Sequence, residues 1–314
     1  MLRTFGLVSA LHVASFPLEA HAMDLDGSKM SFVWGLPFSG MLLSIALFPL
    51  LAAHFWEKHQ GKIAASWAAL ATIPLAIDSG LALTSHAVAH TLIHEFIPFI
   101  LLLLALFTVA GGIVIRGNLH GSPGVNTLLL ALGTILASLI GTTGASMVMI
   151  RPIIRANDDR RKNVHVVVFF IFLVSNIGGS LTPLGDPPLF LGFLRGVEFF
   201  WTTTHLFAET VFVAGLLLAI FYVIDTYLYR RDGHTPPDPT PDNPLRISGG
   251  VNFILMAIII ATLLLTAKLD LGTVNAFGFQ MDLRNIARDA TLIFVVVAST
   301  VWTNTMQMAS RGRR

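Results

Sequence analysis

Two short stretches of the sequence combine oxygen-bearing side chains with residues that interrupt helices. The first, Gly141–Ser146, reads GTTGAS. The second, Asn176–Pro188, reads NIGGSLTPLGDPP and holds three glycines, three prolines and the carboxylate of Asp186. Inside a membrane, a dehydrated Na⁺ takes about five or six oxygen ligands from hydroxyls, amides and unwound backbone carbonyls, while helix ends supply partial charge. The two stretches therefore predict a cation site.

The candidate ligands come from both stretches. They are Thr142, Thr143 and Ser146, then Ser175, Asn176, Ser180 and Thr182, the carbonyls of Gly178 and Gly179, and Asp186. A second interpretation stays open, in which these glycines and hydroxyls only let helices pack closely. Asp186 is the candidate proton carrier, because a carboxylate inside a membrane is costly to keep charged. It could equally cap a helix that begins near Pro187, and the two roles are compatible.

The composition places these stretches in a membrane protein. Of the 314 residues, 54% are apolar and 12% charged, and the mean hydropathy is +0.73. Several apolar runs reach about 20 residues, which is enough to span a bilayer as a helix. The basic residues lie in short loops, as membrane orientation signals do, so the lipid bilayer is the expected partner and nucleic acid is not. The sequence contains no cysteine and no serine-nucleophile, phosphate-loop or zincin pattern, so we expect neither an enzyme nor a cofactor.

Residues 1–22 are typical of a secretory signal peptide, with a basic start, a modest apolar stretch and a small-x-small ending. A short first transmembrane helix is the alternative. The remaining apolar runs predict a multi-pass protein of the bacterial inner membrane. The charged run at residues 57–62 is predicted to form a cytoplasmic turn between the first two spans.

Three histidines, His86, His90 and His94, recur every four residues and would form a stripe on a helix. This stripe could face a metal ion or sense pH, but an interfacial or packing role is the simpler interpretation. No metal beyond Na⁺ is predicted.

The apolar run at residues 125–150 is long enough to cross the membrane, but a crossing would place five basic residues on the outer side. That contradicts the positive-inside bias, and Gly141–Ser146 favours a turn. We therefore expect residues 125–157 to form a re-entrant hairpin. Residues 164–194 are expected to form one crossing that is broken in its middle, because prolines and glycines disfavour helix there. Residues 230–247 read as a proline-rich cytoplasmic linker.

The stretch SNIGGSLTPLGDPPLFLGFLRGVEFFW resembles the NhaD-type sodium/proton antiporters, members of a large ion-transporter superfamily that also holds citrate, dicarboxylate and arsenite carriers. GTTGASMVMIRPIIRAN is similar to the hairpin tip of that family and the residues that follow it. The resemblance extends over about residues 37–289. It implies an all-α inverted-repeat transporter that forms a homodimer, each repeat contributing one re-entrant hairpin and one discontinuous helix. The cation-binding residues it implies are Thr142, Thr143, Ser146, Ser175, Asn176, Gly179, Thr182 and Asp186.

The resemblance implies exchange of Na⁺ or Li⁺ for protons. The main alternative is a sodium-coupled carrier of organic anions or oxyanions from the same superfamily, which would need arginines or helix amino termini at mid-depth. Residues 23–229 correspond to the first repeat, whereas residues 248–314 hold only the start of a second, truncated repeat. A truncated or frameshifted reading frame would explain this, so a third alternative is a membrane protein that does not transport by itself.

Overall fold

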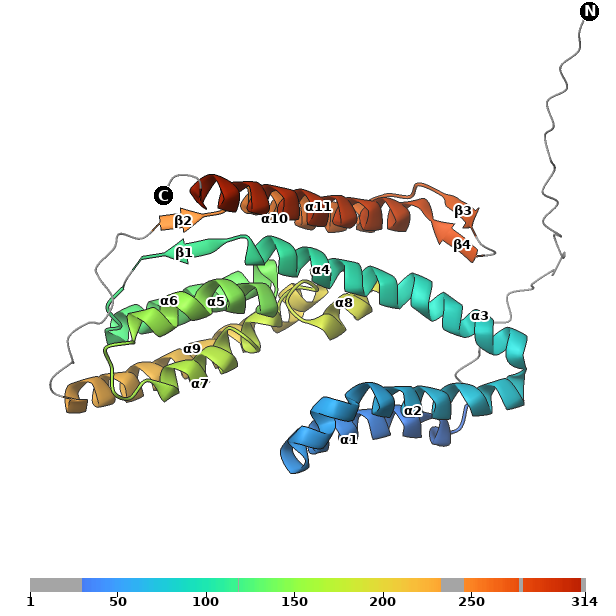
Figure 1. Ribbon diagram of the computed structural model, residues 1–314, viewed down its shortest axis with the longest axis horizontal. Helices are drawn as coiled ribbons and strands as arrows, with labels where there is room; N and C mark the ends of the chain where they lie inside the picture. Colours follow the sequence, from blue (N-terminus) through green and yellow to red (C-terminus); the bar gives the residue numbers. More distant parts are fainter. Residues whose placement is uncertain (1–29, 118, 233–245, 277–278, 312–314) are drawn as a thin grey trace, which may run out of the picture. The chain divides into compact units, whose positions relative to one another are not determined.

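A computed structural model describes residues 30–117, 119–232, 246–276 and 279–311 of the chain. The described residues are almost entirely helical, with two small pairs of strands (Figure 1). They divide into two compact units, one up to Thr91 and one from Leu92 onward, which are described separately. The predicted signal peptide and most of the predicted linker lie outside the described residues.

The first unit is a helical hairpin followed by a shorter helix. A 3₁₀ turn, η2 (Phe32–Gly35), leads into α1 (Leu36–Leu51), and α2 (Ala53–Ser79) and α3 (Leu81–Thr91) follow. The turn between α1 and α2 lies at Ala52, not in the charged run at residues 57–62, which belongs to α2. That prediction was wrong because the run contains no proline and only one glycine, Gly61, so nothing in it prevents a helix from continuing.

The second unit contains the two stretches of interest. It starts with a π-helical turn, η3 (Leu92–Phe96), and continues through helices and short strands. Its elements are α4 (Ile97–Gly111), β1 (Val114–Arg116), α5 (Pro123–Ile140), α6 (Thr142–Ala156), α7 (Val164–Leu173), η4 (Ile177–Gly179), α8 (Pro187–Leu194), α9 (Trp201–Asp232), β2 (Arg246–Ser248), α10 (Gly250–Lys268), β3 (Thr273–Ala276), β4 (Phe279–Asp282) and α11 (Leu283–Arg311).

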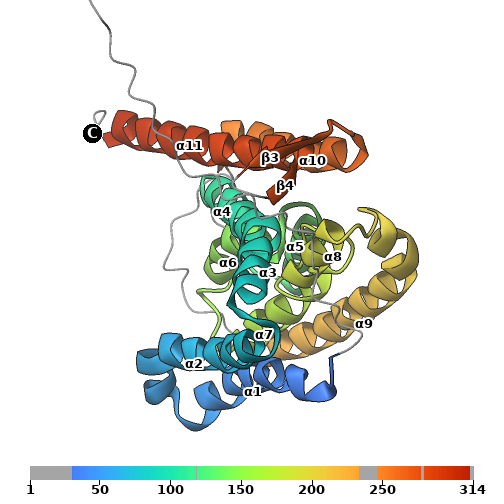
Figure 2. The ribbon, with the colours of Figure 1, turned by 90° about the vertical axis from the view of Figure 1, so that its right-hand side faces the viewer.

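Helix α4 lies in the middle of this unit. The α10–α11 pair runs along one side of it, and α5 and α6 lie on the other, as both views show (Figures 1 and 2). Small residues allow close approach: a Cβ on Gly144 of α6 would lie 3.0 Å from the Cβ of Ala110 in α4. Strand β1 pairs antiparallel with β2, so the chain after the linker returns to the end of α4.

Residues 123–156 form a helical hairpin around a single glycine. Helices α5 and α6 run antiparallel, since Asn126 near the start of α5 hydrogen-bonds Asn157, which follows the end of α6. Gly141 makes the turn with φ +81° and ψ 153°, a conformation that residues with a Cβ rarely adopt. The prediction that the backbone turns at this point is confirmed. That the hairpin enters and leaves on one membrane face stays a prediction.

The predicted break in the next crossing is confirmed. Helix α7 has ten residues and is about 15 Å long, and α8 has eight and is about 12 Å long. Each covers about half of a hydrocarbon core of roughly 30 Å. Between them only the three residues of η4 are helical. Gly178, Gly179 and Pro183–Gly185 are buried, so protein surrounds much of this irregular backbone, as membrane depth requires.

The described residues hold six helices that are long and apolar enough to cross a membrane, by length and composition. Many large apolar side chains on them are exposed; examples on α9 are Val211, Phe212 and Val223. An apolar surface of this extent suits contact with lipid tails. The chain is thus an all-α, multi-pass membrane protein, as predicted from the composition.

Gly141→Ala should destabilise the hairpin by about 1–3 kcal/mol, because the new Cβ would strain a positive-φ position and lie 2.8 Å from the carbonyl oxygen of Leu184. The measurement is the midpoint of thermal unfolding in detergent. Gly124→Ala is the control, since Gly124 lies in α5 with no atom within 4 Å of an added Cβ. Equal midpoints for the two variants would contradict the role assigned to Gly141.

Candidate functional site

The turn of the hairpin touches the break in the discontinuous helix through backbone atoms. The amide nitrogen and Oγ1 of Thr142 both donate to the carbonyl oxygen of Gly185, at 3.2 and 3.1 Å. Gly179 and Gly185 face each other so closely that a Cβ on either would overlap the backbone of the other. Only glycine allows this approach, which explains why the break is rich in glycine.

Hydroxyl groups join the end of α5 to the break. Ser138 Oγ donates to the carbonyl oxygen of Gly178 at 2.6 Å, and Thr182 Oγ1 donates to the carbonyl oxygen of Ser138 at 2.6 Å. On the α6 side, the hydroxyls of Ser146 and Ser175 lie 2.8 Å apart. A hydroxyl that donates one hydrogen bond keeps lone pairs on its oxygen, so these groups can still coordinate a cation.

Helix α9 supports the break from the other side. Thr202 and Thr203 both donate to the carbonyl oxygen of Leu181, and Ser180 Oγ lies 2.9 Å from Oγ1 of Thr210. The first two bonds satisfy the carbonyl of Leu181, which an interrupted helix would otherwise leave unpaired inside a membrane, and the third joins two hydroxyls. The conformation of the break is therefore fixed by two neighbouring elements, α5 and α9.

The eight ligands that the family resemblance implies fall into two groups. Five lie at the contact between hairpin and break: Thr142, Ser146, Ser175, Gly179 and Thr182. The side chains of Thr143, Asn176 and Asp186 are exposed on the same elements. The carboxylate of Asp186 makes no capping bond to α8, although Asp186 occupies the N-cap position. The capping role considered for Asp186 is therefore not realised.

Four helix ends meet at this contact. Helix α5 ends at Ile140 and α7 at Leu173, and their last carbonyls give the site a partial negative charge. Helices α6 and α8 begin at Thr142 and Pro187, which adds partial positive charge beside it. The arrangement suits a cation on one side and an anionic group on the other, as in the discontinuous helices of secondary transporters.

The two amino termini differ in what they can donate. In α8 the first two residues are prolines, and the amides of Leu189 and Phe190 already donate to the carbonyl oxygen of Asp186. In α6 the amide of Thr142 is bonded to Gly185 and that of Ala145 to Gly141. No acceptor for the amides of Thr143 and Gly144 is found among the described residues, so α6 offers two backbone donors to an anion.

A cavity of about 340 Å³ adjoins the hairpin tip. It is bounded by apolar side chains of α4, such as Phe99 and Leu103, and by backbone of the tip and the break, including Thr143 and Gly185. No lysine or arginine is among the described residues that line it. The polar groups available inside it are consequently backbone atoms and the two threonines of the tip.

Two residues of this contact, Ser138 and Gly185, were not among the residues predicted from the sequence. Ser138 lies within the apolar α5 and carries no signal of its own, since a hydroxyl inside a helix usually bonds its own backbone. Gly185 was considered only as a helix breaker, whereas the carbonyl of Gly178 was among the predicted ligands. The spacing of glycines on both sides of the break could have indicated a close backbone crossing.

The three histidines of the stripe, His86, His90 and His94, make ring contacts in the structure. The described residues contain no group of three or more His, Cys, Asp or Glu side chains placed to hold a metal ion. His86 and His90 stack on each other in α3, with ring centroids 6.5 Å apart, while His94 belongs to the second unit and contacts Phe279. These ring contacts are of the kind that the packing interpretation implies, and that interpretation stays a prediction.

Comparison with known proteins supplies a family. No curated protein and no solved structure matches the chain. The sequence model of one family, described as "Putative citrate transport", matches residues 27–312 and thus nearly the whole chain. This finding agrees with the six apolar helices and the broken helix at the centre of the second unit. The chain belongs to this citrate-transport family of membrane transporters.

Proposed function

We propose that the protein is a secondary transporter that carries a small organic carboxylate, such as citrate, together with Na⁺. The observation that carries this proposal is the meeting of four helix ends at the contact between hairpin and break. It provides separate places for a cation and for a carboxylate within one site. The family to which the chain belongs supports the choice of substrate.

The cation is expected beside the ends of α5 and α7. Ser146 and Ser175 offer two hydroxyl oxygens, and Thr182 offers a third close to the end of α5. Asp186, the exposed carboxylate of the break, would supply the negative charge that makes dehydration of Na⁺ favourable. This assignment keeps Ser146, Ser175, Thr182 and Asp186 from the cation ligands predicted from the sequence, whereas Thr143 is assigned to the anion.

The carboxylate of the substrate is expected at the amino terminus of α6. There the amides of Thr143 and Gly144 and the exposed hydroxyl of Thr143 can donate to an oxyanion. An anion carrier was expected to need arginines or helix amino termini at mid-depth, and the amino terminus of α6 at the site supports this choice. For this reason the organic-anion carrier is preferred here over the exchange of Na⁺ for protons.

Exchange of Na⁺ for protons is the second candidate. One observation favours it: the cavity at the tip has no basic side chain among its described lining residues, whereas Asp186 is available to exchange a proton for a cation. The resemblance to NhaD-type antiporters points the same way. Both candidates share the cation site and differ in whether an organic anion accompanies the ion.

The orientation in the membrane is part of the proposal. The last turn of α6 carries Arg155, the connection after it carries Arg160, Arg161 and Lys162, and the end of α9 carries Arg230 and Arg231. Placing these residues in the cytoplasm satisfies the positive-inside bias if the hairpin enters and leaves on that face. The site then lies within the bilayer of a bacterial inner membrane, accessible from the cavity.

Transport in proteoliposomes distinguishes the two candidates. We expect uptake of radiolabelled citrate that requires an inward Na⁺ gradient, with no proton movement driven by Na⁺ alone. Proton efflux driven by Na⁺ without citrate, read with a pH-sensitive dye, would support the exchanger instead. If neither flux occurs, binding of ²²Na⁺ and citrate to the protein in nanodiscs still tests the site, and absence of both would refute the proposal.

Asp186→Asn should abolish cation-dependent flux while leaving membrane insertion intact, because it removes the charge that offsets Na⁺ dehydration. In nanodiscs we expect ²²Na⁺ affinity to fall by about a hundredfold, or about 2.7 kcal/mol. Asp78→Asn is the matched control, since Asp78 is also an exposed carboxylate of an apolar helix but lies in the first unit. Unchanged Na⁺ affinity in Asp186→Asn would remove this residue from the mechanism.

Two substitutions at the hairpin tip should each weaken the binding of only one ligand, Na⁺ or citrate. Ser146→Ala removes a hydroxyl from the cation side and should weaken Na⁺ binding about tenfold with little effect on the affinity for citrate at saturating Na⁺. Thr143→Val removes a donor from the amino terminus of α6 and should weaken citrate binding by a similar factor, while Na⁺ binding stays unchanged. Equal effects on both ligands in both variants would contradict separate subsites.

A further inference from the structure

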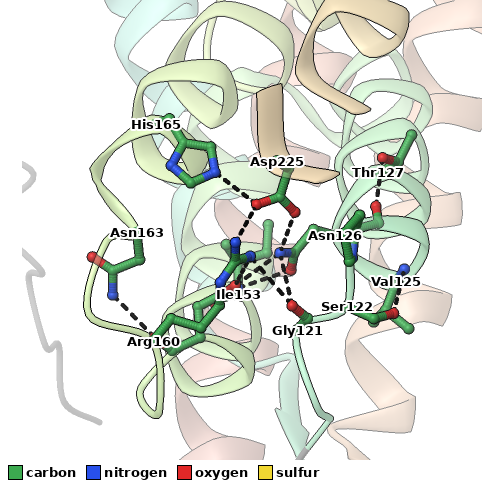
Figure 3. A network of polar contacts seen from close by, with 12 residues as sticks. Gly121, Ser122, Val125, Asn126, Thr127, Ile153, Arg160, Asn163, His165 and Asp225 are labelled. Atoms are coloured by element: carbon green, nitrogen blue, oxygen red, sulfur yellow. Dashed lines mark hydrogen bonds and ion pairs between the residues drawn. The ribbon is translucent and has the colours of Figure 1, made fainter. Parts of the chain in front are cut away.

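A second cluster of polar side chains lies at the opposite end of the hairpin, where α5 begins and α6 ends (Figure 3). Its centre is Asp225 of α9, whose side chain is completely buried within an apolar helix. Around it lie Asn126 of α5, Asn157 and Arg160 of the segment after α6, and His165 of α7. None of these residues belongs to the site described above.

The carboxylate of Asp225 is contacted by donors on both oxygens. Oδ1 lies 2.7 Å from Nε2 of His165 and 2.6 Å from Nη2 of Arg160. Oδ2 accepts from Nδ2 of Asn126 at 3.0 Å. A carboxylate and a guanidinium balance each other, so the cluster is neutral as long as the imidazole is neutral. Buried ionic groups require such balance.

The two asparagines fix which groups donate. Asn157 Nδ2 donates to Oδ1 of Asn126 at 2.8 Å, so the amide that Asn126 turns toward Asp225 is its NH₂ group. An ionised carboxylate only accepts hydrogen bonds. With Asp225 ionised opposite Arg160, a neutral imidazole of His165 that bonds it therefore carries its proton on Nε2.

His165 is the member of the cluster that can accept a proton from water. Its side chain is 13% exposed, against 2% for Arg160 and 0% for Asp225. With Nε2 bonded to Asp225, the free lone pair is on Nδ1, which bonds no other group in the described part of the chain. A proton taken up at Nδ1 yields an imidazolium that remains paired with Asp225.

The charged and titratable groups that face His165 are few. Helix α9 contributes Asp225, and Tyr229 lies under the guanidinium of Arg160, whose Cζ is 5.3 Å from the ring centroid. The segment after α6 contributes Arg160, and α5 contributes only the uncharged Asn126. The other side of the imidazole stacks on Phe221, at 5.9 Å between centroids. One anion and one cation thus determine what protonation does.

We propose that His165 is a proton-binding site of this transporter, held by Asp225 and linked through Arg160 to the base of the hairpin. The proposal rests on the proposed function in assigning the proton a part in transport. An imidazolium and Arg160 would compete for the same oxygen of Asp225, because both are cations within hydrogen-bond distance of Oδ1. Proton binding to His165 therefore weakens the ion pair between Asp225 and Arg160.

Of the two groups at Oδ1 of Asp225, Arg160 is the one that can move away. Nη1 bonds the carbonyl oxygen of Gly121 at 3.3 Å and Oδ1 of Asn157 at 3.2 Å, both at the base of the hairpin. Nη2 is close to Asp225 without the alignment of a hydrogen bond, and Nε has no partner among the described residues. A displaced Arg160 changes the contacts of Asn157 and Gly121, so proton binding at His165 alters the base of the hairpin, where Asn126 and Asn157 bridge the start of α5 and the end of α6.

His165→Gln tests this, because glutamine can still donate to Asp225 but cannot take up a proton. The pH dependence of citrate uptake is measured between about pH 5 and 8, where histidine titrates. We expect wild-type uptake to change about tenfold over this range and that of His165→Gln to change less than about twofold. His205→Gln is the matched control, since His205 is an exposed histidine of α9 that stacks on Trp201. A wild-type pH profile in His165→Gln overturns the proposal, since a purely structural role would predict it.

A second measurement keeps the proposal testable if the protein transports no citrate. In protein carrying ¹⁵N-labelled histidine in nanodiscs, the resonance lost in His165→Gln identifies His165. In its neutral form it should show a proton on Nε2 only, and on acidification it should become doubly protonated. A proton on Nδ1 instead, or a signal that never titrates, overturns the proton site whatever the transported substrate proves to be.

Discussion

The contact between the hairpin turn and the broken helix is the interaction on which the rest of the second unit depends. Thr142 donates twice to Gly185, and Gly179 lies against Gly185 with no room for a Cβ. The hairpin turn and the break thereby pair backbone hydrogen-bonding groups with each other where helical hydrogen bonds are absent. The same contact sets four helix ends side by side, so the electrostatics of the site follow directly from how the irregular backbone is satisfied.

The surrounding helices stabilise this contact through side chains placed outside it. Ser138 of α5 and Thr202 and Thr203 of α9 bond carbonyl oxygens of the break. Together these bonds pair two carbonyls, those of Gly178 and Leu181. An unpaired carbonyl would cost several kcal/mol in hydrocarbon, on the order of the loss of one buried hydrogen bond or more. A single constraint, that polar backbone groups inside a membrane must be hydrogen-bonded, therefore accounts for the glycines, the hydroxyls on α5 and α9, and the position of α9.

The two ends of the hairpin have opposite chemistry. At its turn, hydroxyls and free backbone groups leave room for an ion and a carboxylate. At its base, Asn126, Asn157 and Arg160 form a dense network with Asp225 that leaves one lone pair, on His165, for a proton. Since α5 and α6 connect both ends, the helical hairpin would physically link the proposed substrate site to the proposed proton site. Such a link is what coupling in a secondary transporter requires.

The sequence by itself determined the class of the protein and the places where its helices break. Apolar runs predict spans whatever the tertiary structure, and Gly141 and the residues between Asn176 and Pro188 mark breaks because glycine and proline act locally. Which polar groups meet was decided only by the tertiary structure. Asp225 is one carboxylate within an apolar run, and its partners are 60 to 99 residues away along the chain. Ser138 likewise acquires its role only once the break crosses the end of α5, and Asp186, predicted to be a ligand or a cap, caps nothing. The local tendency to form or break a helix is determined by neighbouring residues. The pairing of buried polar groups depends on how helices that are distant in the sequence pack together.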